Sequence, residues 1–138
     1  MRRLELMPFQ ASTIVAPSTE QIRAAVFDLP YKGDSGLHFV GDGPGASLVI
    51  TSHNELGFCV VLELSDGRSL ALSASPEDRG LVETWLCQNP VRMPRSHFVS
   101  VENAFSAALA FAKDTENGGT QTAGRVGPWV TFCPEEPR

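Results

Sequence analysis

The run Gly33-Asp34-Ser35-Gly36 is the part of the sequence closest to a catalytic motif, because it matches the residues around the nucleophile of chymotrypsin-like serine proteases. That chemistry needs a histidine base and an orienting aspartate on a two-barrel scaffold. Here the serine stands at position 35, every histidine follows it, and a chain of 138 residues is too short for two barrels. The run therefore predicts a turn rather than a nucleophile.

The remaining side chains that bind metals or attack substrates are three histidines and three cysteines: His38, His53, His97, Cys59, Cys87 and Cys133. They form no H-x-x-x-H, H-E-x-x-H or C-x-x-C spacing, so we expect no metal and no cofactor. Each cysteine lies in an apolar stretch, which predicts buried structural thiols in a reducing compartment. A histidine–cysteine pair formed by folding stays open, since such pairs are spatial rather than sequential.

Charge and length narrow the class of protein further. The 138 residues fit one domain, 1–138, and carry 16 acidic against 11 basic residues, a net charge of −5. A surface of that sign repels nucleic acid and anionic lipid and attracts a basic protein. Glu5 and Pro8 interrupt the apolar region that a secretory signal at the N-terminus would need. No run has the ~18 apolar residues of a membrane span. We therefore expect a cytoplasmic protein.

Two segments have the pattern of helices, 18–29 and 101–113. Ser18 can cap the first helix with Gln21 as its capping-box partner, and Pro30 follows its end. Ser100 precedes the second, which has a wide apolar face rich in alanine. The polar, Gly-rich residues 115–127 after it predict a loop.

The other apolar stretches predict a sheet. Residues 3–16 and 37–40 read as extended, and the runs 47–51, 57–64 and 69–73 follow with turns between them. The dipeptide Asp66-Gly67 is a hairpin signal, and connections this short join antiparallel neighbours. The fold class is therefore α+β, an antiparallel meander sheet packed by two helices.

Residues 75–89 are ambiguous, because Ser75-Pro76 can begin a helix whereas 81–87 is rich in strand-forming residues. We favour a strand that continues the meander. Pro90 to Pro94 predicts a loop, residues 97–99 and 128–132 predict short extended segments, and 134–138 predicts a frayed tail.

The aromatic and acidic side chains are candidates for binding. Glu63 and Glu83 lie inside apolar runs, where alternation predicts that they point outward from a sheet with one solvated face. Trp129 is predicted in the core, beside Val130 and Phe132. Trp85 suits either the core or an interface, and the sequence favours the core.

Three segments resemble the Imm1-type immunity proteins of bacterial polymorphic toxin systems. They are the helix 18–29 after an extended start, the meander 56–73 continuing into 81–86, and the run Phe98 to Phe111 with a later Trp129. In the third segment a short strand ends at a serine cap and an Ala-rich helix follows. The resemblance spans roughly residues 13–132, and the Gly-rich stretches 33–46 and 115–127 depart from the pattern.

The resemblance implies an immunity protein, not an enzyme, that binds one cognate toxin, often a nuclease or deaminase, and covers its active site. Its acidic face would mimic the phosphates of a basic toxin's substrate. The candidate contacts are outward acidic residues and one aromatic anchor: Glu63, Asp66, Glu77, Asp78, Glu83 and Trp85.

Two alternatives belong to other classes. An adaptor or chaperone for a secreted protein would bind an extended segment by strand addition, and a small hydrolase would use Ser35 or a cysteine. The toxin's chemistry and the oligomeric state of the chain stay open.

Overall fold

The computed structural model describes residues 3–7, 12–15, 17–32, 36–40, 47–53, 56–73, 80–86, 89–113 and 126–132. The helices are α1 (Thr19–Asp28) and α2 (Val101–Lys113), with single 3-10 turns η1 (Leu29–Lys32) and η3 (Arg95–His97). The strands are β1 (Arg3–Met7), β2 (Ser12–Val15), β3 (Gly36–Val40), β4 (Ser47–His53), β5 (Gly57–Glu63), β6 (Ser69–Leu72), β7 (Leu81–Leu86), β8 (Asn89–Pro94), β9 (Phe98–Val99) and β10 (Trp129–Thr131).

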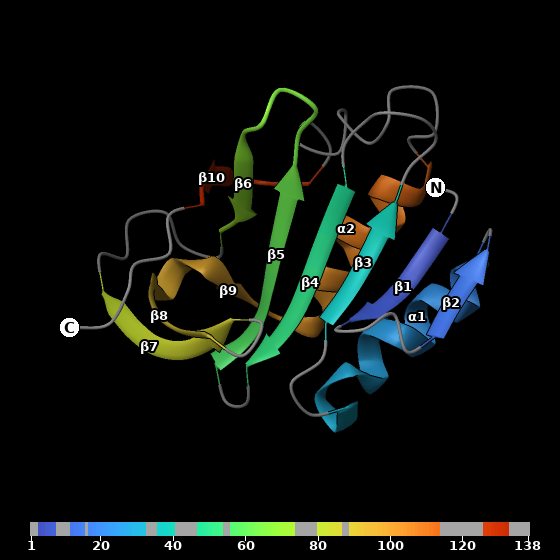
Figure 1. Cartoon of the computed structure of the whole chain (residues 1–138), viewed down its shortest axis with the longest axis horizontal. Helices are drawn as coiled ribbons and strands as arrows, with labels where there is room; N and C mark the ends of the chain where they lie inside the picture. Colours follow the sequence, from blue (N-terminus) through green and yellow to red (C-terminus); the bar gives the residue numbers. More distant parts are fainter. Residues whose placement is uncertain are drawn as a thin grey trace.

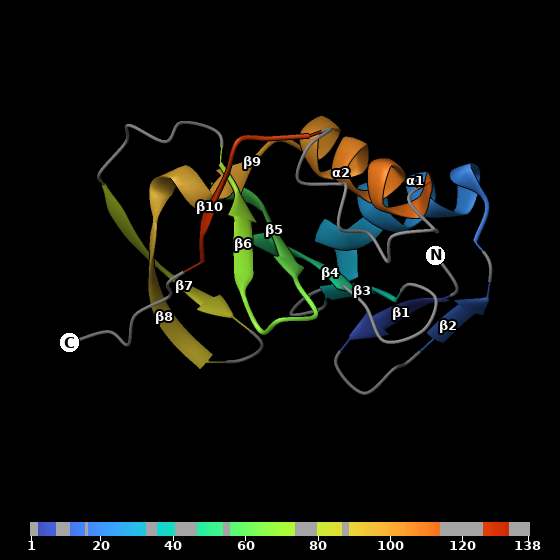
Figure 2. The ribbon, with the colours of Figure 1, turned by 90° about the horizontal axis from the view of Figure 1, so that it is seen from above.

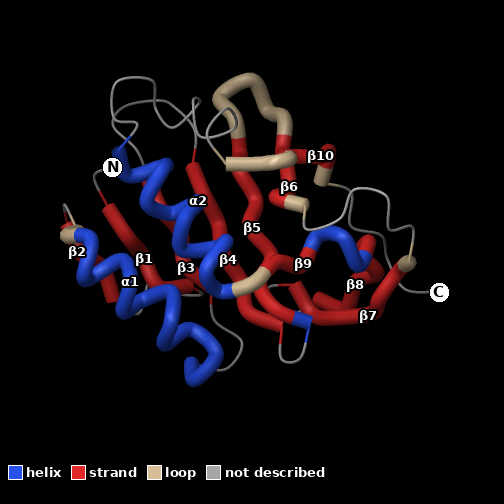
Figure 3. Tube along the Cα trace, turned by 180° about the vertical axis from the view of Figure 1, so that it is seen from behind, coloured by secondary structure: helices blue, strands red, loops and turns tan. Residues whose placement is uncertain are grey.

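An eight-stranded antiparallel sheet forms the centre of the molecule, in the order β10-β6-β5-β4-β3-β1-β2, with β9 paired to β5 beside this path. Both helices lie on one face of it (Figure 1), and Figure 3 shows them from that side. The predicted α+β class, with an antiparallel sheet and two helices, is confirmed.

The two helices begin where their caps predict. The Ser18 and Gln21 side chains each accept a hydrogen bond from the other residue's backbone N–H, at 3.1 Å and 2.9 Å, which forms the predicted capping box of α1. The Ser100 hydroxyl accepts from the Asn103 amide at 3.2 Å and caps α2. Predicted helix 18–29 is thus observed as α1 with its two caps, and 101–113 is observed as α2.

The sheet is buried on both faces along β5. Phe58, Val60 and Leu62 point toward the helices, into a first core that includes the buried alanines of α2. Cys59 and Val61 point to the opposite face. A second, smaller core forms there from Cys59, Val61, Met93 and Phe98. A strand buried on both sides reads as a continuous apolar run, which is how β5 appears in the sequence.

Two glycines have backbone angles that favour glycine. Gly57 begins β5 with φ +112°, and a Cβ there would lie 2.6 Å from the Val99 carbonyl oxygen on β9. Only glycine lets the two strands approach this closely. Gly67, with φ +92°, forms the predicted β5–β6 turn, in which the Leu64 amide donates to the Arg68 carbonyl at 2.8 Å.

The predicted meander is confirmed for β4, β5 and β6, but it does not continue into β7. The strand predicted at 81–86 exists, yet it pairs with β8 in a separate two-stranded sheet, and β10 takes the position beside β6. Figure 2 shows this β7–β8 hairpin at the end of the molecule away from β1 and β2.

The predicted loop at Pro90–Pro94 is wrong, because these residues form most of β8. Proline is tolerated in a strand where its nitrogen faces away from the partner strand. The predicted turn at 33–35, the start of the 115–127 loop as far as 125, and the tail 134–138 lie outside the described residues.

Candidate protein-binding surface

The outer side of β7 presents large apolar side chains to solvent. Leu81 and Trp85 are 49% and 60% exposed, with the exposed Glu83 between them at the alternate position. Val82 and Thr84 point the other way, and Val82 packs against the second core. The sequence prediction of a core Trp85 is therefore wrong, since Trp85 shares the solvent face with Glu83.

The cross-strand partners on β8 complete this outer band. Leu81 lies opposite Pro94, Glu83 opposite Arg92, and Trp85 opposite Pro90. We call these six residues the hairpin band: Leu81, Glu83, Trp85, Pro90, Arg92 and Pro94.

An open pocket of about 310 Å³ lies at the Trp85 end of the hairpin band. It is lined by Glu83, Thr84, Trp85, Pro90 and Val91. A carboxylate beside an exposed indole suits a cationic side chain, because both the charge and the face of the ring attract it.

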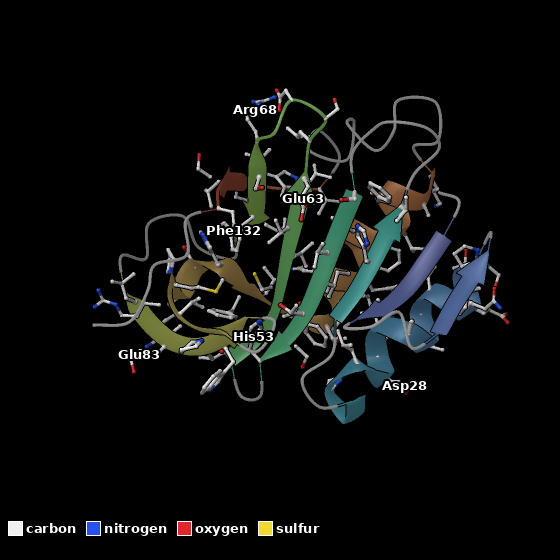
Figure 4. The ribbon with its side chains drawn as sticks, in the orientation of Figure 1. Asp28, His53, Glu63, Arg68, Glu83 and Phe132 are labelled. Carbon is white, nitrogen blue, oxygen red and sulfur yellow. The ribbon has the colours of Figure 1, made fainter. Side chains whose placement is uncertain are left out.

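The predicted acidic contacts that the structure describes do not gather on one surface. Figure 4 places Glu63 at the top of β5 and Glu83 at the lower left, on the hairpin. Asp66 lies in the β5–β6 turn beyond Glu63, where its carboxylate accepts from the Arg68 amide at 3.0 Å and forms an ion pair with the Arg68 side chain at 2.8 Å. These bonds to Arg68 lower the pKa of Asp66. Glu77 and Asp78 lie outside the described residues. Of the four predicted contacts that the structure describes, Glu83 and Trp85 lie together, and Glu63 and Asp66 lie elsewhere.

A buried polar cluster fixes the hairpin to the main sheet. The two ring nitrogens of His53, on β4, contact hydroxyls: Nε2 lies 2.6 Å from Oγ1 of Thr51, and Nδ1 lies 2.8 Å from Oγ1 of Thr84, on β7. Thr51 also hydrogen-bonds the thiol of Cys59, its partner across β4 and β5. The His53 and Phe98 rings pack in a T-shaped arrangement with 5.1 Å between centroids. The cluster thus joins β4, β5, β7 and β9 in one chain of contacts.

Burial keeps this cluster uncharged at neutral pH. It lowers the pKa of His53 to about 4, and it raises the pKa of Cys59 to about 12 despite the hydrogen bond from Thr51. A cysteine nucleophile needs a thiolate beside an imidazolium. Burial favours the opposite protonation states for His53 and Cys59, and the contacts of the cluster link the hairpin to the main sheet.

His97, in η3, is the second buried histidine. It is 2% exposed, burial lowers its pKa, and neither ring nitrogen has a hydrogen-bond partner among the described residues. Its ring lies 5.9 Å from that of Phe132. The predicted core residue Trp129 is half-buried against the first core, and its indole N–H donates to the Val126 carbonyl.

Within the described ranges, no three His, Cys, Asp or Glu side chains are grouped so as to hold a metal ion. Neither α1 nor α2 has the length and hydropathy that crossing a bilayer requires. Cys87, Cys133 and Ser35 lie outside the described residues.

Sequence reasoning missed Leu81, Pro90, Arg92 and Pro94 as members of the hairpin band. The available signal was the alternation in Pro90-Val91-Arg92-Met93-Pro94, in which apolar Val91 and Met93 occupy every second position.

Comparison with known proteins returns no match of statistical significance to a protein-family model, a curated protein or a solved structure.

Proposed function

We propose that this chain is an immunity protein that binds a cognate bacterial toxin domain in the cytoplasm and covers its active site. The hairpin band is the surface that makes the contact. The partner is basic, because the chain carries a net charge of −5 and the band itself presents the Glu83 carboxylate. Inhibition is by occlusion and requires no chemistry from this chain.

The observation that supports this proposal is the exposure of Trp85. Tryptophan is among the residues most enriched at the energetic centres of protein interfaces. Here the ring is 60% exposed and lines a pocket of about 310 Å³ that a partner side chain can enter, and the exposed Leu81 lies on the same face of β7, beyond Glu83. An exposed apolar patch rimmed by polar residues marks an interaction surface.

The arrangement of the second core also supports a binding role. Met93 is fully buried under the hairpin, and the Thr84 hydroxyl is 2.8 Å from the His53 ring. The hairpin is therefore held in place before a partner arrives. A preorganised surface binds more tightly, because less conformational freedom is lost on association.

The test is co-expression with the product of the neighbouring reading frame. We expect that product to kill cells alone, this chain to rescue them, and the two to co-purify one to one. In Trp85→Ala the binding should weaken by about 30-fold or more, as for an interface centre. A harmless neighbour, or lack of rescue by the wild-type chain, would refute the proposal.

Two glutamates provide a matched comparison. Glu63 and Glu83 are both exposed on strands, but only Glu83 belongs to the hairpin band. We expect Glu83→Ala to weaken binding and to reduce its salt dependence, while Glu63→Ala binds as the wild type does. Mapping the bound region to the toxin's catalytic domain rather than to its leader separates an immunity protein from the adaptor alternative.

A further inference from the structure

The two edges of the β7–β8 hairpin differ in their capacity to accept another strand. In an antiparallel pair, opposite residues alternate between those that hydrogen-bond each other and those whose amides point away. The Arg95 amide donates to the Gly80 carbonyl at 2.8 Å, which makes Gly80 and Arg95 a bonded pair. Continuing this register, Val82 bonds Met93 and Thr84 bonds Val91.

The remaining residues therefore point their amides outward. On β8 these are Pro90, Arg92 and Pro94. Proline has no N–H, so two of the three donors are missing from the β8 edge. Pairing of a further strand with the β8 edge is therefore disfavoured, and prolines commonly protect exposed sheet edges in this way.

The β7 edge has no such protection. Leu81, Glu83 and Trp85 direct their N–H and C=O groups away from β8, and none of them is proline. No described strand pairs with this edge, and Figure 1 shows β7 on the periphery of the molecule. An edge with all its donors present is a template for an added strand.

The side chains at the same three positions indicate what kind of strand fits. Leu81 and Trp85 offer apolar contacts at the two ends, and Glu83 offers a carboxylate at the centre beside the pocket. The one basic side chain of the band, Arg92, is half-buried with its Nε atom inside the protein. Glu83 is exposed whereas Arg92 is half-buried, so the carboxylate is the more accessible of the two charges beside the β7 edge.

We infer that a basic extended segment of the partner adds to the open edge of β7 as a further antiparallel or parallel strand, with a Lys or Arg side chain at Glu83 and the Trp85 ring. This mode of binding rests on the proposed function and specifies its partner contact. Main-chain hydrogen bonds supply the attachment, and Glu83 selects the charge.

A second copy of this chain is a less suitable occupant. Two β7 strands paired antiparallel about Glu83 set the two Glu83 carboxylates opposite each other. Like charges directly opposite in a sheet are destabilising.

The test measures amide hydrogen exchange in the ¹⁵N-labelled full chain, alone and in complex with the toxin domain obtained by co-expression. In the free chain the amides of Leu81, Glu83 and Trp85 should exchange fast, while those of Val82 and Thr84 are protected by β8. On binding, the three fast amides should slow by at least about 100-fold, because they become hydrogen-bonded.

A pair of variants separates the backbone from the side chain. Glu83→Pro and Glu83→Ala both remove the carboxylate, but only Glu83→Pro also removes the outward N–H. We expect Glu83→Pro to bind about tenfold or more weakly than Glu83→Ala, since it loses a hydrogen bond and its ring obstructs the added strand. Both variants keep the β7–β8 ladder, and equal thermal midpoints verify this.

If a complex forms but the three amides still exchange fast, or if Glu83→Pro binds as well as Glu83→Ala, strand addition is refuted and the proposed function stands. If the amides are slow without the toxin and the chain sediments as a dimer, a second copy occupies the edge and the inference is refuted. If no complex forms, the proposed function fails and the inference fails with it.

Discussion

Lowering the pH should destabilise the protein through His53, the residue that joins β4 to β7. Burial holds the pKa of the folded imidazole near 4, against the ordinary 6.5 of the unfolded chain. Between these values the unfolded state binds a proton that the folded state excludes. The stability associated with the neutral ring is therefore present above pH 6.5 and is lost as the pH falls toward 4.

The size of the loss follows from the two pKa values. Proton linkage between pH 7 and pH 5 removes about 2 kcal/mol for a shift from 6.5 to about 4. Carboxylates and His97 also titrate as the pH falls, so the wild-type loss alone does not identify His53. The comparison is with His53→Gln, which keeps an amide able to hydrogen-bond but has no titrating ring.

Urea unfolding followed by tryptophan fluorescence, at several pH values between 7 and 5, measures the free energy of unfolding of both proteins. The variant's overall stability does not matter, because the pH dependence is compared. We expect the wild type to lose about 2 kcal/mol more than His53→Gln over this range. Parallel losses in the two proteins would show that the folded His53 ring titrates normally and that the buried cluster is not as described.

Four further substitutions test the fold by the same unfolding measurement. Gly57→Ala should lower the free energy of unfolding by about 3 kcal/mol or more, because φ at Gly57 is +112° and the new Cβ would lie 2.6 Å from the Val99 carbonyl oxygen. Gly67→Ala should lower it by only about 1–2 kcal/mol, because no atom lies within 4 Å of the new Cβ. Equal losses in the two variants would contradict the close approach of β5 and β9. Ser18→Ala should lower the free energy of unfolding by about 1 kcal/mol, because it removes the α1 cap. An unchanged stability would show that the cap does not stabilise the fold. Thr84→Val should cost about 1–3 kcal/mol by leaving a buried imidazole nitrogen without its partner, and a neutral effect would mean that the hairpin is not attached there.

Local signals predicted much of the fold. The capping residues of both helices and the Asp66-Gly67 turn act through neighbours within a few positions, so their effect is readable from the sequence. The strand at 81–86 was also predicted from its composition. Each of these features depends on contacts between residues close in the chain.

The pairing of strands that are distant in the chain could not be predicted from the sequence. The choice of β10 rather than β7 as the neighbour of β6 depends on how two cores fill space, and no residue in β7 encodes it alone. The prolines at 90 and 94 favour a loop in the sequence, because the direction of their backbone nitrogens relative to β7 is visible only once the strand register is known. The same holds for Trp85, whose exposure depends on which face of β7 meets the second core.

The β7–β8 hairpin separates the proposed contact residues from the residues that build the two cores. Among the described strands, β7 and β8 pair only with each other in a backbone ladder, and Leu81, Glu83 and Trp85 contribute no buried side chain to either core. Mutations at these three positions can therefore accumulate with little loss of folded protein. For the proposed binding function, this means that the contact residues of β7 can change to fit a different partner while the residues of the two cores stay the same.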